Sequence, residues 1–408
     1  MYDLAIVGGG AAGLATAVFV ARRTAGRRIV VLDGAKKLGA KILISGGGRC
    51  NVTNDVVTAG DFWGGSRHVI RRVLAAFPAD ETVAFFREIG VSLHVEPGGK
   101  MFPDTNRART VLDALLGEAA RCGVQILAGH RVTGIGRKDD GFELSTTARM
   151  FRAMRVVLAS GGRSVPKTGS DGTGYRFAQS LGHSLVPQTP ALVPLILEGD
   201  FHAGLSGISQ QVEITVRVEG ARPTRLCGSM LWTHFGVSGP VVLNASRHWH
   251  AARLQNRSVS LSFSFFPGDS FETIERRLID LASSQPRVAA HNALASLLPA
   301  RVAVAIIARL DIDAKLPMGQ LSRDARRKLG AALIDWPLAV RDSRGYQYAE
   351  VTAGGVPLDE IDPRTMESRR CPGLFLVGEI LDVDGRIGGF NFQWAWSSAW
   401  VASVAIVG

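Results

Sequence analysis

Residues 2–13 read YDLAIVGGGAAG, an apolar run that ends in a glycine cluster and continues into an alanine-rich stretch. The run Tyr2–Val7 predicts a buried strand, and Ala11–Arg23, which contains no proline, predicts a helix. Ile29–Leu32 follows as a second apolar run. The order strand, turn, helix, strand predicts a right-handed parallel βαβ unit and places the chain in the α/β class.

The glycine cluster has the spacing GxGxxG through Gly8, Gly10 and Gly13. In such a turn the first glycine permits a tight bend, the second lets the backbone approach a pyrophosphate, and the third lets the helix pack on the strand. The helix N-terminus then offers N–H groups to the phosphates. Asp33, at the end of the second strand, can accept hydrogen bonds from a ribose. These features together predict a Rossmann-like dinucleotide site rather than a glycine-rich turn without a ligand.

Lys36 and Lys37 follow Asp33 and can be interpreted in two ways. Two cations near the ribose can read a 2′-phosphate, which would favour NADP. The carboxylate of Asp33 would repel that phosphate, so the sequence favours a solvated loop at these lysines.

A second glycine-rich segment, Ser45–Asn51, reads SGGGRCN and lies in a stretch, residues 40–66, that we expect to be an irregular loop. Three successive glycines expose backbone N–H groups and let a flat ring approach. Arg49 adds a fixed cation, and Asn51 adds a donor and an acceptor. The pattern predicts a segment that passes along a ring or its pyrophosphate; the alternative is a mobile surface loop.

In two further segments a predicted strand also leads into glycine. The predicted strand Met154–Leu158 leads into the glycine-rich residues 159–175, and Leu374–Val377 leads into Gly378 and Glu379. A strand that ends in glycine plus an acid can hold the hydroxyls of a ribityl chain. Gly388 and Gly389 precede a predicted helix, Asn391–Val404, whose N-terminus would favour the negative charge of a reduced flavin.

The middle of the chain has a different pattern. Val212–Val218 and Ser258–Phe266 alternate polar and apolar residues, which is typical of half-buried antiparallel strands. Four helical patterns follow, at residues 271–282, 290–298, 302–310 and 324–334. We therefore expect a first part of one domain at 1–190, an inserted strand-then-helix domain at 191–340, and a return to the first domain at 341–408.

Composition limits the function classes. The 408 residues include 46% hydrophobic and 20% charged residues, as in an ordinary globular protein. The formal net charge of +11 allows a polyanionic partner such as RNA, but the basic residues, 39 Arg and 8 Lys, are scattered and form no block of five. Nucleic acid is therefore not the expected partner.

The remaining motifs argue against several other chemistries. The four cysteines, Cys50, Cys122, Cys227 and Cys371, form no CxxC pair, so we expect free thiols in a reducing compartment. His248 and His250 have no acid or cysteine near them in sequence, so we expect no metal site. Neither a signal peptide nor an apolar run of membrane-spanning length is visible, and the expected location is the cytoplasm.

Five stretches together carry a resemblance: LGAKILISGGGRCNVTN (38–54), TGSDGTGY (168–175), MLWTHFGVSGP (230–240), TAGGV (352–356) and VGEILDVDGRIGGFNFQWA (377–395). The chain resembles the HI0933-like flavoprotein family, also described as BaiN/RdsA-type NAD(P)/FAD-dependent oxidoreductases, over nearly its whole length. The resemblance implies an FAD domain interrupted by an inserted β-barrel and helical domain. It also implies FAD contacts at matching positions: Gly8, Gly10, Gly13, Asp33, Ser45, Gly46, Gly47, Arg49, Gly378, Asp382, Gly389 and Asn391. Many FAD proteins carry Glu where this chain carries Asp33.

The full set of cofactor residues that we predict adds neighbours in the same segments: Ala11, Ala12, Gly34, Lys41, Cys50, Asn51, Ser160, Gly161, Glu379, Gly388 and Phe390. The expected function is hydride transfer through non-covalently bound FAD, with NAD(P)H as transient electron donor and a small-molecule substrate. Alternatives are an oxidase of a small amine or alcohol, a flavin-dependent RNA-modifying protein, and a non-catalytic flavin-binding protein. Candidates for a general acid are Cys50, His234 and Glu379; His234 can equally be a structural histidine.

Overall fold

The computed structural model describes residues 1–24 and 26–408, which form two compact units. The first unit comprises Met1–Ala191 and Tyr346–Gly408, and the second comprises Leu192–Gly345. The chain leaves the first unit next to the boundary that the sequence suggested. It returns between Gly345 and Tyr346, later than the expected position at 340/341.

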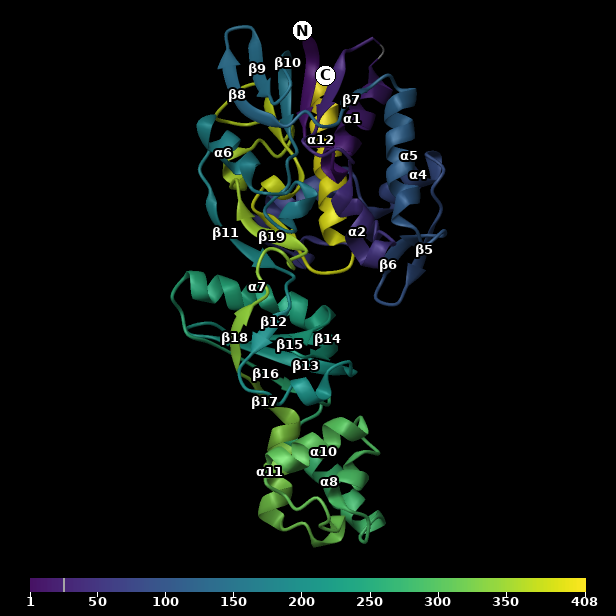
Figure 1. The fold of residues 1–408 in the computed structure, drawn as a ribbon, viewed down its shortest axis with the longest axis vertical. Helices are drawn as coiled ribbons and strands as arrows, with labels where there is room; N and C mark the ends of the chain where they lie inside the picture. The colour runs from purple at the N-terminus through teal and green to yellow at the C-terminus, as the bar shows by residue number, and fades with distance from the viewer. Residues whose placement is uncertain (25) are drawn as a thin grey trace. The chain divides into compact units, whose positions relative to one another are not determined.

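A seven-stranded sheet forms the centre of the first unit (Figure 1). Its order is β7-β2-β1-β10-β9-β8, and β20 also pairs with β10. The bounds are β1 Tyr2–Val7, β2 Ile29–Leu32, β7 Gln125–Leu127, β8 Val132–Lys138, β9 Gly141–Thr146, β10 Met150–Leu158 and β20 Leu374–Leu376. β7, β2, β1, β10 and β20 are mutually parallel, whereas β9 and β8 add an antiparallel hairpin.

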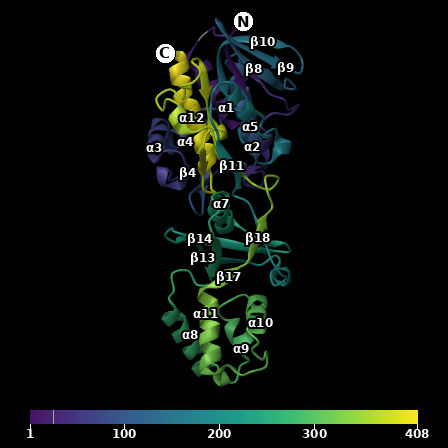
Figure 2. The ribbon, with the colours of Figure 1, turned by 90° about the vertical axis from the view of Figure 1, so that its left-hand side faces the viewer.

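Helices cover this sheet. α1 (Ala11–Arg23) packs along α12 (Phe390–Val407), which joins the two ends of the chain in one layer, and α5 (Ala108–Arg121) packs against α1 (Figure 2). The unit also contains α3 (Arg67–Ala76), α4 (Ala79–Glu88) and α6 (Thr173–Ser180). Because β1 lies between β2 and β10, its carboxyl end is a topological switch point, where open parallel sheets bind ligands.

The segment 40–66 is more ordered than the expected loop. It contains α2 (Ala40–Gly48), β3 (Thr53–Asn54), a 3₁₀ turn η1 (Ala59–Asp61) and β4 (Phe62–Gly64). Ala40–Leu43 begins a helical turn, but Ser45, Gly46 and Gly47 leave helical geometry, with φ of 55° and 68° at the two glycines. The glycine count masked this short helix in the sequence.

Smaller elements surround the sheet. β5 (Leu93–Glu96) and β6 (Lys100–Pro103) form a hairpin, and β6 also pairs with β3. β11 (Val186–Ala191) pairs with β19 (Val351–Gly355), and β4 pairs with β21 (Val383–Gly385). The further 3₁₀ turns of this unit are η2 (Pro166–Thr168), η5 (Leu358–Glu360) and η6 (Gly378–Ile380), and the second unit contains η3 (Ala203–Leu205) and η4 (Met318–Gln320).

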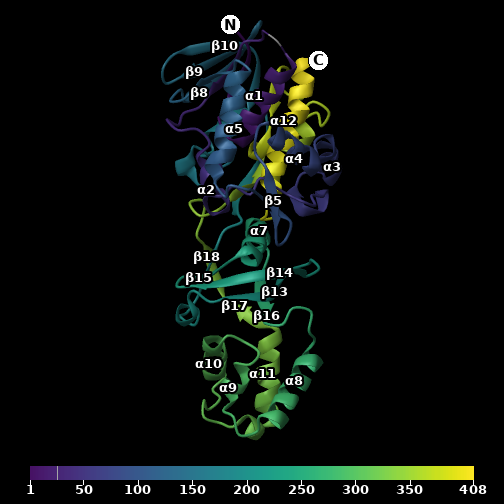
Figure 3. The same cartoon turned by 90° about the vertical axis from the view of Figure 1, so that its right-hand side faces the viewer.

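The second unit is an antiparallel sheet with helices on its two sides (Figure 3). The strand order is β17-β16-β13-β14-β15-β12-β18. The bounds are β12 Leu195–Leu197, β13 Ser209–Val218, β14 Thr224–Thr233, β15 Gly236–Ser238, β16 Val259–Ser264, β17 Trp336–Leu338 and β18 Val340–Ser343. β17 and β18 are separated by Ala339 alone, and this one stretch of chain pairs with β16 through β17 and with β12 through β18. The strand order therefore begins and ends in the same stretch of chain.

The helices of the second unit are α7 Pro240–Leu254, α8 Phe271–Ser284, α9 Ala290–Leu294, α10 Ala300–Arg309 and α11 Arg323–Ile334. The sequence predicted the last four but not α7. Pro240 follows Gly239 as the first helical residue, a common helix start, so the sequence did carry a signal for α7. α7 packs on β13 and β14 and shares one apolar core with the other helices.

Candidate functional site

Four segments from distant parts of the sequence meet at the carboxyl edge of the parallel strands. They are the turn after β1, Asp33 after β2, Ser160 after β10 and Gly378 after β20. A β-carbon built on Gly8 would lie 2.4 Å from the carbonyl oxygen of Ala159. One built on Gly378 would lie 2.8 Å from the β-carbon of Ala12. The segments are therefore in direct contact.

The three fingerprint glycines differ in what surrounds them. A β-carbon on Gly13 would lie 1.9 Å from the carbonyl oxygen of Gly8, so internal packing excludes a side chain there as it does at Gly8. A β-carbon on Gly10 would meet no protein atom within 4 Å. Gly10 is also the N-cap of α1, and no side chain caps that helix. The first turn of α1, with Ala11 and Ala12, thus offers its N–H groups beside open space, as a pyrophosphate site requires.

Asp33 fixes the shape of this turn. One carboxylate oxygen accepts a hydrogen bond from the backbone N–H of Gly9 at 2.6 Å, and the other accepts one from Ala35 at 2.7 Å. Each oxygen keeps a lone pair for a further donor such as a ribose hydroxyl. Gly34 packs against Arg131, whose β-carbon would lie 3.0 Å from a β-carbon added to this glycine.

Ser160 supplies a second sign of a missing partner. Its hydroxyl is buried and has no hydrogen-bond partner among the described residues, although its backbone lies against Gly8. Gly161 follows with φ of 72°, where a β-carbon would lie 2.6 Å from the hydroxyl of Ser170. The hydroxyl oxygen would lie 1.7 Å from a β-carbon built on Gly174, so the side chain is turned toward the first turn of α6. We call Gly8–Gly13 with Asp33 and Ser160 the cradle.

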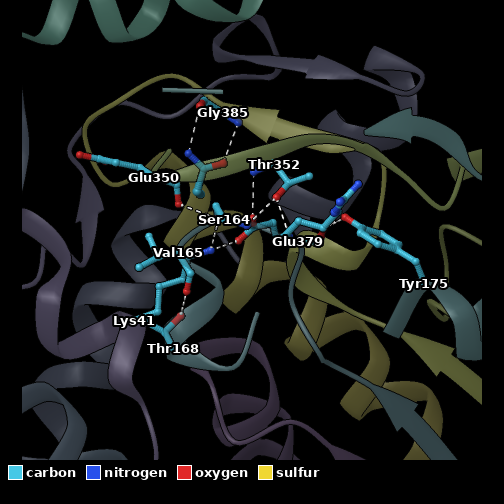
Figure 4. A network of polar contacts seen from close by, with 11 residues as sticks. Lys41, Ser164, Val165, Thr168, Tyr175, Glu350, Thr352, Glu379 and Gly385 are labelled. Atoms are coloured by element: carbon cyan, nitrogen blue, oxygen red, sulfur yellow. Dashed lines mark hydrogen bonds and ion pairs between the residues drawn. The ribbon is translucent and has the colours of Figure 1, made fainter. Parts of the chain in front are cut away.

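A network of polar contacts is centred on Glu379 (Figure 4). The Nζ atom of Lys41 lies 2.6 Å from Oε2 of Glu379 and 2.5 Å from Oγ of Ser164. Oε1 accepts hydrogen bonds from the Ser164 hydroxyl and from the backbone N–H of Thr352, each at 2.9 Å. The Glu379 carboxylate therefore meets three hydrogen-bond donors.

The same network fixes the turn after β10. Oγ of Thr352 accepts hydrogen bonds from the backbone N–H groups of Arg163 and Ser164, at 2.8 and 3.1 Å. A β-carbon on Gly162 would lie 2.4 Å from Oγ1 of Thr352. Sequence reasoning did not single out Ser164 or Thr352, although Thr352 is a polar residue within the buried strand β19.

Side chains of the SGGGRCN segment, which the sequence predicted to contact the cofactor, make contacts within the protein. Arg49 makes a bidentate ion pair with Glu96, its shortest N–O distance 2.6 Å, and stacks over the ring of Phe102. This pairing lowers the pKa of Glu96. Asn51 accepts a hydrogen bond from the backbone N–H of Met101. The cation that the sequence assigned to the cofactor is thus neutralised by a carboxylate.

Ser45, Gly46 and Cys50 of this segment contact neighbouring protein atoms. Ser45 donates its hydroxyl to the carbonyl of Ile42, and a β-carbon on Gly46 would lie 2.9 Å from the Phe102 ring. Cys50 is completely buried, and burial raises the pKa of its thiol to about 12. A protonated, enclosed thiol is poorly placed to exchange protons with a substrate. Gly47 alone in this group faces open space.

The C-terminal segment is held by its own contacts. Asn391 makes two hydrogen bonds to the backbone of Gly385, at 2.8 and 2.9 Å, so its amide closes the loop before α12. Gly389 is the N-cap of α12, with φ of 94°, and a β-carbon there would lie 2.3 Å from the carbonyl of Thr53. The carbonyl of Gly388 accepts a hydrogen bond from Asn54.

Two predicted residues of this segment are buried. Phe390 is fully enclosed and packs edge-on against Phe62, and the Asp382 side chain is 8% exposed. The backbone carbonyl of Asp382 accepts a hydrogen bond from Gly65, so β21 and β4 fix this stretch. The N-terminus of α12 has no side-chain cap, as at α1.

His234 lies in the second unit, at the exposed turn between β14 and β15. Its ring contacts that of Phe235, whereas Trp232 belongs to the apolar core. The side chain is therefore not a core histidine.

His248 and His250 lie on α7 within the same unit, and burial lowers the pKa of each to about 4. The described residues contain no cluster of three or more metal-ligating side chains. No helix of the described chain is long and apolar enough to cross a membrane.

Comparison with known proteins identifies the family, since the HI0933-like protein Rossmann domain model matches residues 2–405. The chain belongs to this family. An Escherichia coli protein described as ribosomal RNA dihydrouridine synthase is 32% identical, covering 100% of this chain and 98% of the relative. A Clostridium scindens protein described as 3-dehydro-bile acid delta(4,6)-reductase is also 32% identical, covering 99% of each chain.

Solved structures share the fold at low identity. The E. coli quinol fumarate reductase flavoprotein aligns over 100% of this chain and 70% of its own, with TM-score 0.53 and 17% identity. A 3-ketosteroid delta1-dehydrogenase from Sterolibacterium denitrificans aligns over 100% and 99%, with TM-score 0.53 and 12% identity. Family and cradle together make this chain an FAD-binding oxidoreductase.

Proposed function

We propose that the protein reduces a carbon–carbon double bond conjugated to a carbonyl group, with bound FAD as the hydride carrier and NAD(P)H as the donor. FAD supplies the hydride chemistry, and the protein supplies binding, orientation and electrostatics. The observation that carries the cofactor assignment is Gly10, which faces open space beside an uncapped helix N-terminus. No further GxGxxG lies between a strand and a helix in the sequence, which favours transient docking of the nicotinamide.

The substrate class is supported by the two relatives that align over the full length. Dihydrouridine differs from uridine by saturation of a ring double bond conjugated to a carbonyl. The name of the bile-acid reductase places its double bonds in conjugation with a 3-keto group. Both reactions add a hydride to one carbon and a proton to its neighbour. Chemistry common to two relatives at 32% identity is the best-supported choice for this chain.

Anaerobic half-reactions test the proposal. NADH or NADPH should bleach the flavin absorbance, and a conjugated enone such as 2-cyclohexenone should restore it without oxygen. If the reduced flavin is reoxidised rapidly by oxygen but by neither an enone nor an RNA uridine, the protein is an oxidase and the proposal is wrong. If neither NADH nor NADPH reduces the flavin, NAD(P)H is not the electron donor.

Reduction of uridine within RNA is a second candidate. The net charge of +11 favours it, because phosphate contacts supply much of the affinity of RNA-binding proteins. A ribosomal RNA transcript replaces the enone in the same experiment. Reoxidation by RNA and not by free uridine would assign this substrate, and the rate should then fall steeply with added salt.

A further inference from the structure

Glu379 presents an electrostatic problem. It follows Gly378, which contacts Ala12 in the first turn of α1, so Glu379 is the next residue after the strand end that meets the segment that would hold a doubly charged pyrophosphate. A half-buried carboxylate near two further negative charges would weaken anion binding. The side chain of Glu379 is only 18% exposed, so water screens it poorly.

Lys41 pairs with the Glu379 carboxylate. Its ammonium group touches both Glu379 and Ser164, and Ser164 touches Glu379 in turn, so the three polar groups form a closed triangle. The pair links residues 338 positions apart in sequence. Two of the three N–H groups of Lys41 are used in these contacts, and the ammonium group is turned to Glu379.

We propose that Lys41 is a positioning residue that acts through Glu379: it neutralises this carboxylate and holds it where FAD can bind beside it. Lys41 in this account is not a direct phosphate ligand. The ion pair presents no net charge to the cofactor, and the ordered carboxylate keeps one lone pair on Oε2 for a hydroxyl donor. The inference rests on FAD binding and not on the choice of substrate.

The effects of replacing Lys41 and Glu379 on FAD binding should not be additive. Removing the lysine alone leaves a buried unpaired carboxylate, which is more damaging than removing both partners. The single variant Lys41→Met should therefore bind FAD worse than the double variant Lys41→Met/Glu379→Gln. A direct phosphate contact predicts instead that the double variant binds FAD no better than Lys41→Met, because both variants lack that contact.

The experiment measures the FAD dissociation constant of reconstituted protein and the midpoint potential of the bound flavin. We expect Lys41→Met to weaken FAD binding about tenfold or more and to lower the potential, because an unpaired carboxylate disfavours the anionic reduced flavin. The double variant should recover most of both losses. Lys41→Arg keeps the charge and should remain close to the unchanged protein.

Controls separate this role from a general effect of charge or folding. Lys138→Met removes an exposed cation from β8 of the same unit and should change neither quantity. Thermal midpoints of the apoproteins report folding independently of FAD. The proposal is overturned if Lys41→Met binds FAD normally, or if the double variant binds as weakly as Lys41→Met. Enone or RNA turnover enters neither readout, so failure of the proposed substrate would leave this result standing.

Discussion

Two glycines that look alike in the sequence have opposite explanations in the structure. Gly10 in the cradle and Gly47 in the SGGGRCN segment both face open space. Gly47 has φ of 68°, a left-handed conformation that itself favours glycine, whereas Gly10 has φ of −86°, which any residue adopts. Neither packing nor a left-handed backbone requires glycine at position 10, and a bound ligand accounts for it, while backbone geometry suffices at position 47.

The largest effect is expected at Gly13, where glycine is needed for packing. Gly13→Ala would place a methyl group 1.9 Å from the carbonyl oxygen of Gly8, so α1 has to move away from β1. We expect a loss of stability of about 4 kcal/mol or more, together with loss of FAD. Chemical denaturation of the apoprotein measures it; an unchanged midpoint would show that the turn is looser than described.

Gly10→Val should separate binding from folding. The β-carbon meets no protein atom, so the apoprotein should unfold at nearly the unchanged temperature. The side chain fills the space of the pyrophosphate, and FAD content after purification should fall to a small fraction. Full FAD occupancy in this variant would place the phosphates elsewhere.

Gly47→Ala should show the reverse pattern. A left-handed alanine costs about 1–2 kcal/mol, so stability falls while FAD affinity changes little. Gly47→Asn, which tolerates this conformation better, is the matched control and should be milder. Equal losses of FAD in Gly47→Ala and Gly10→Val would abolish the distinction between the two segments.

Arg49→Ala tests the ion pair that replaces the expected cofactor contact. The pair with Glu96 is partly exposed, and solvent screening leaves such pairs a small contribution to stability even beside an aromatic contact. A small drop in thermal midpoint with full FAD content is expected. Loss of FAD at unchanged stability would restore the direct role for Arg49.

Thiol labelling gives the smallest effect. With its pKa raised to about 12 and no exposure, Cys50 is protonated at pH 8 and should resist iodoacetamide, while the exposed Cys227 is labelled. Raising the pH increases the thiolate fraction of Cys50 only as the pH approaches 12, so native labelling should stay low up to pH 9. Rapid labelling of Cys50 in the folded protein, read by peptide mass, would show that the SGGGRCN segment opens.

Local patterns predicted the parts of the fold that local sequence determines. The bounds of β1, α1 and β2 match the predicted ranges, because apolar runs and a proline-free alanine-rich stretch specify them directly. α2 was hidden because a single helical turn runs into glycines that count against a helix. The pairing of β17 with β16 and of β18 with β12 joins segments far apart in the sequence, which periodicity does not report.

In the candidate site too, the sequence predicted the residues that belong to a local motif. Gly8, Gly10, Gly13 and Asp33 follow from one short motif and its flanking strands. The ion pair of Lys41 with Glu379 and that of Arg49 with Glu96 join segments far apart in the chain. The sequence named Lys41, Glu379 and Arg49 as cofactor residues, because nothing local showed that Lys41 pairs with Glu379 or that Arg49 pairs with Glu96.

The most direct test of the cradle is the flavin content of the purified protein. Acid denaturation should release FAD into the supernatant, near one molecule per chain, because the cofactor is held by the glycine turn and the helix N-termini without a covalent bond. Yellow colour that remains with the acid precipitate would indicate covalent attachment. Colourless protein that takes up no FAD on reconstitution would contradict the account.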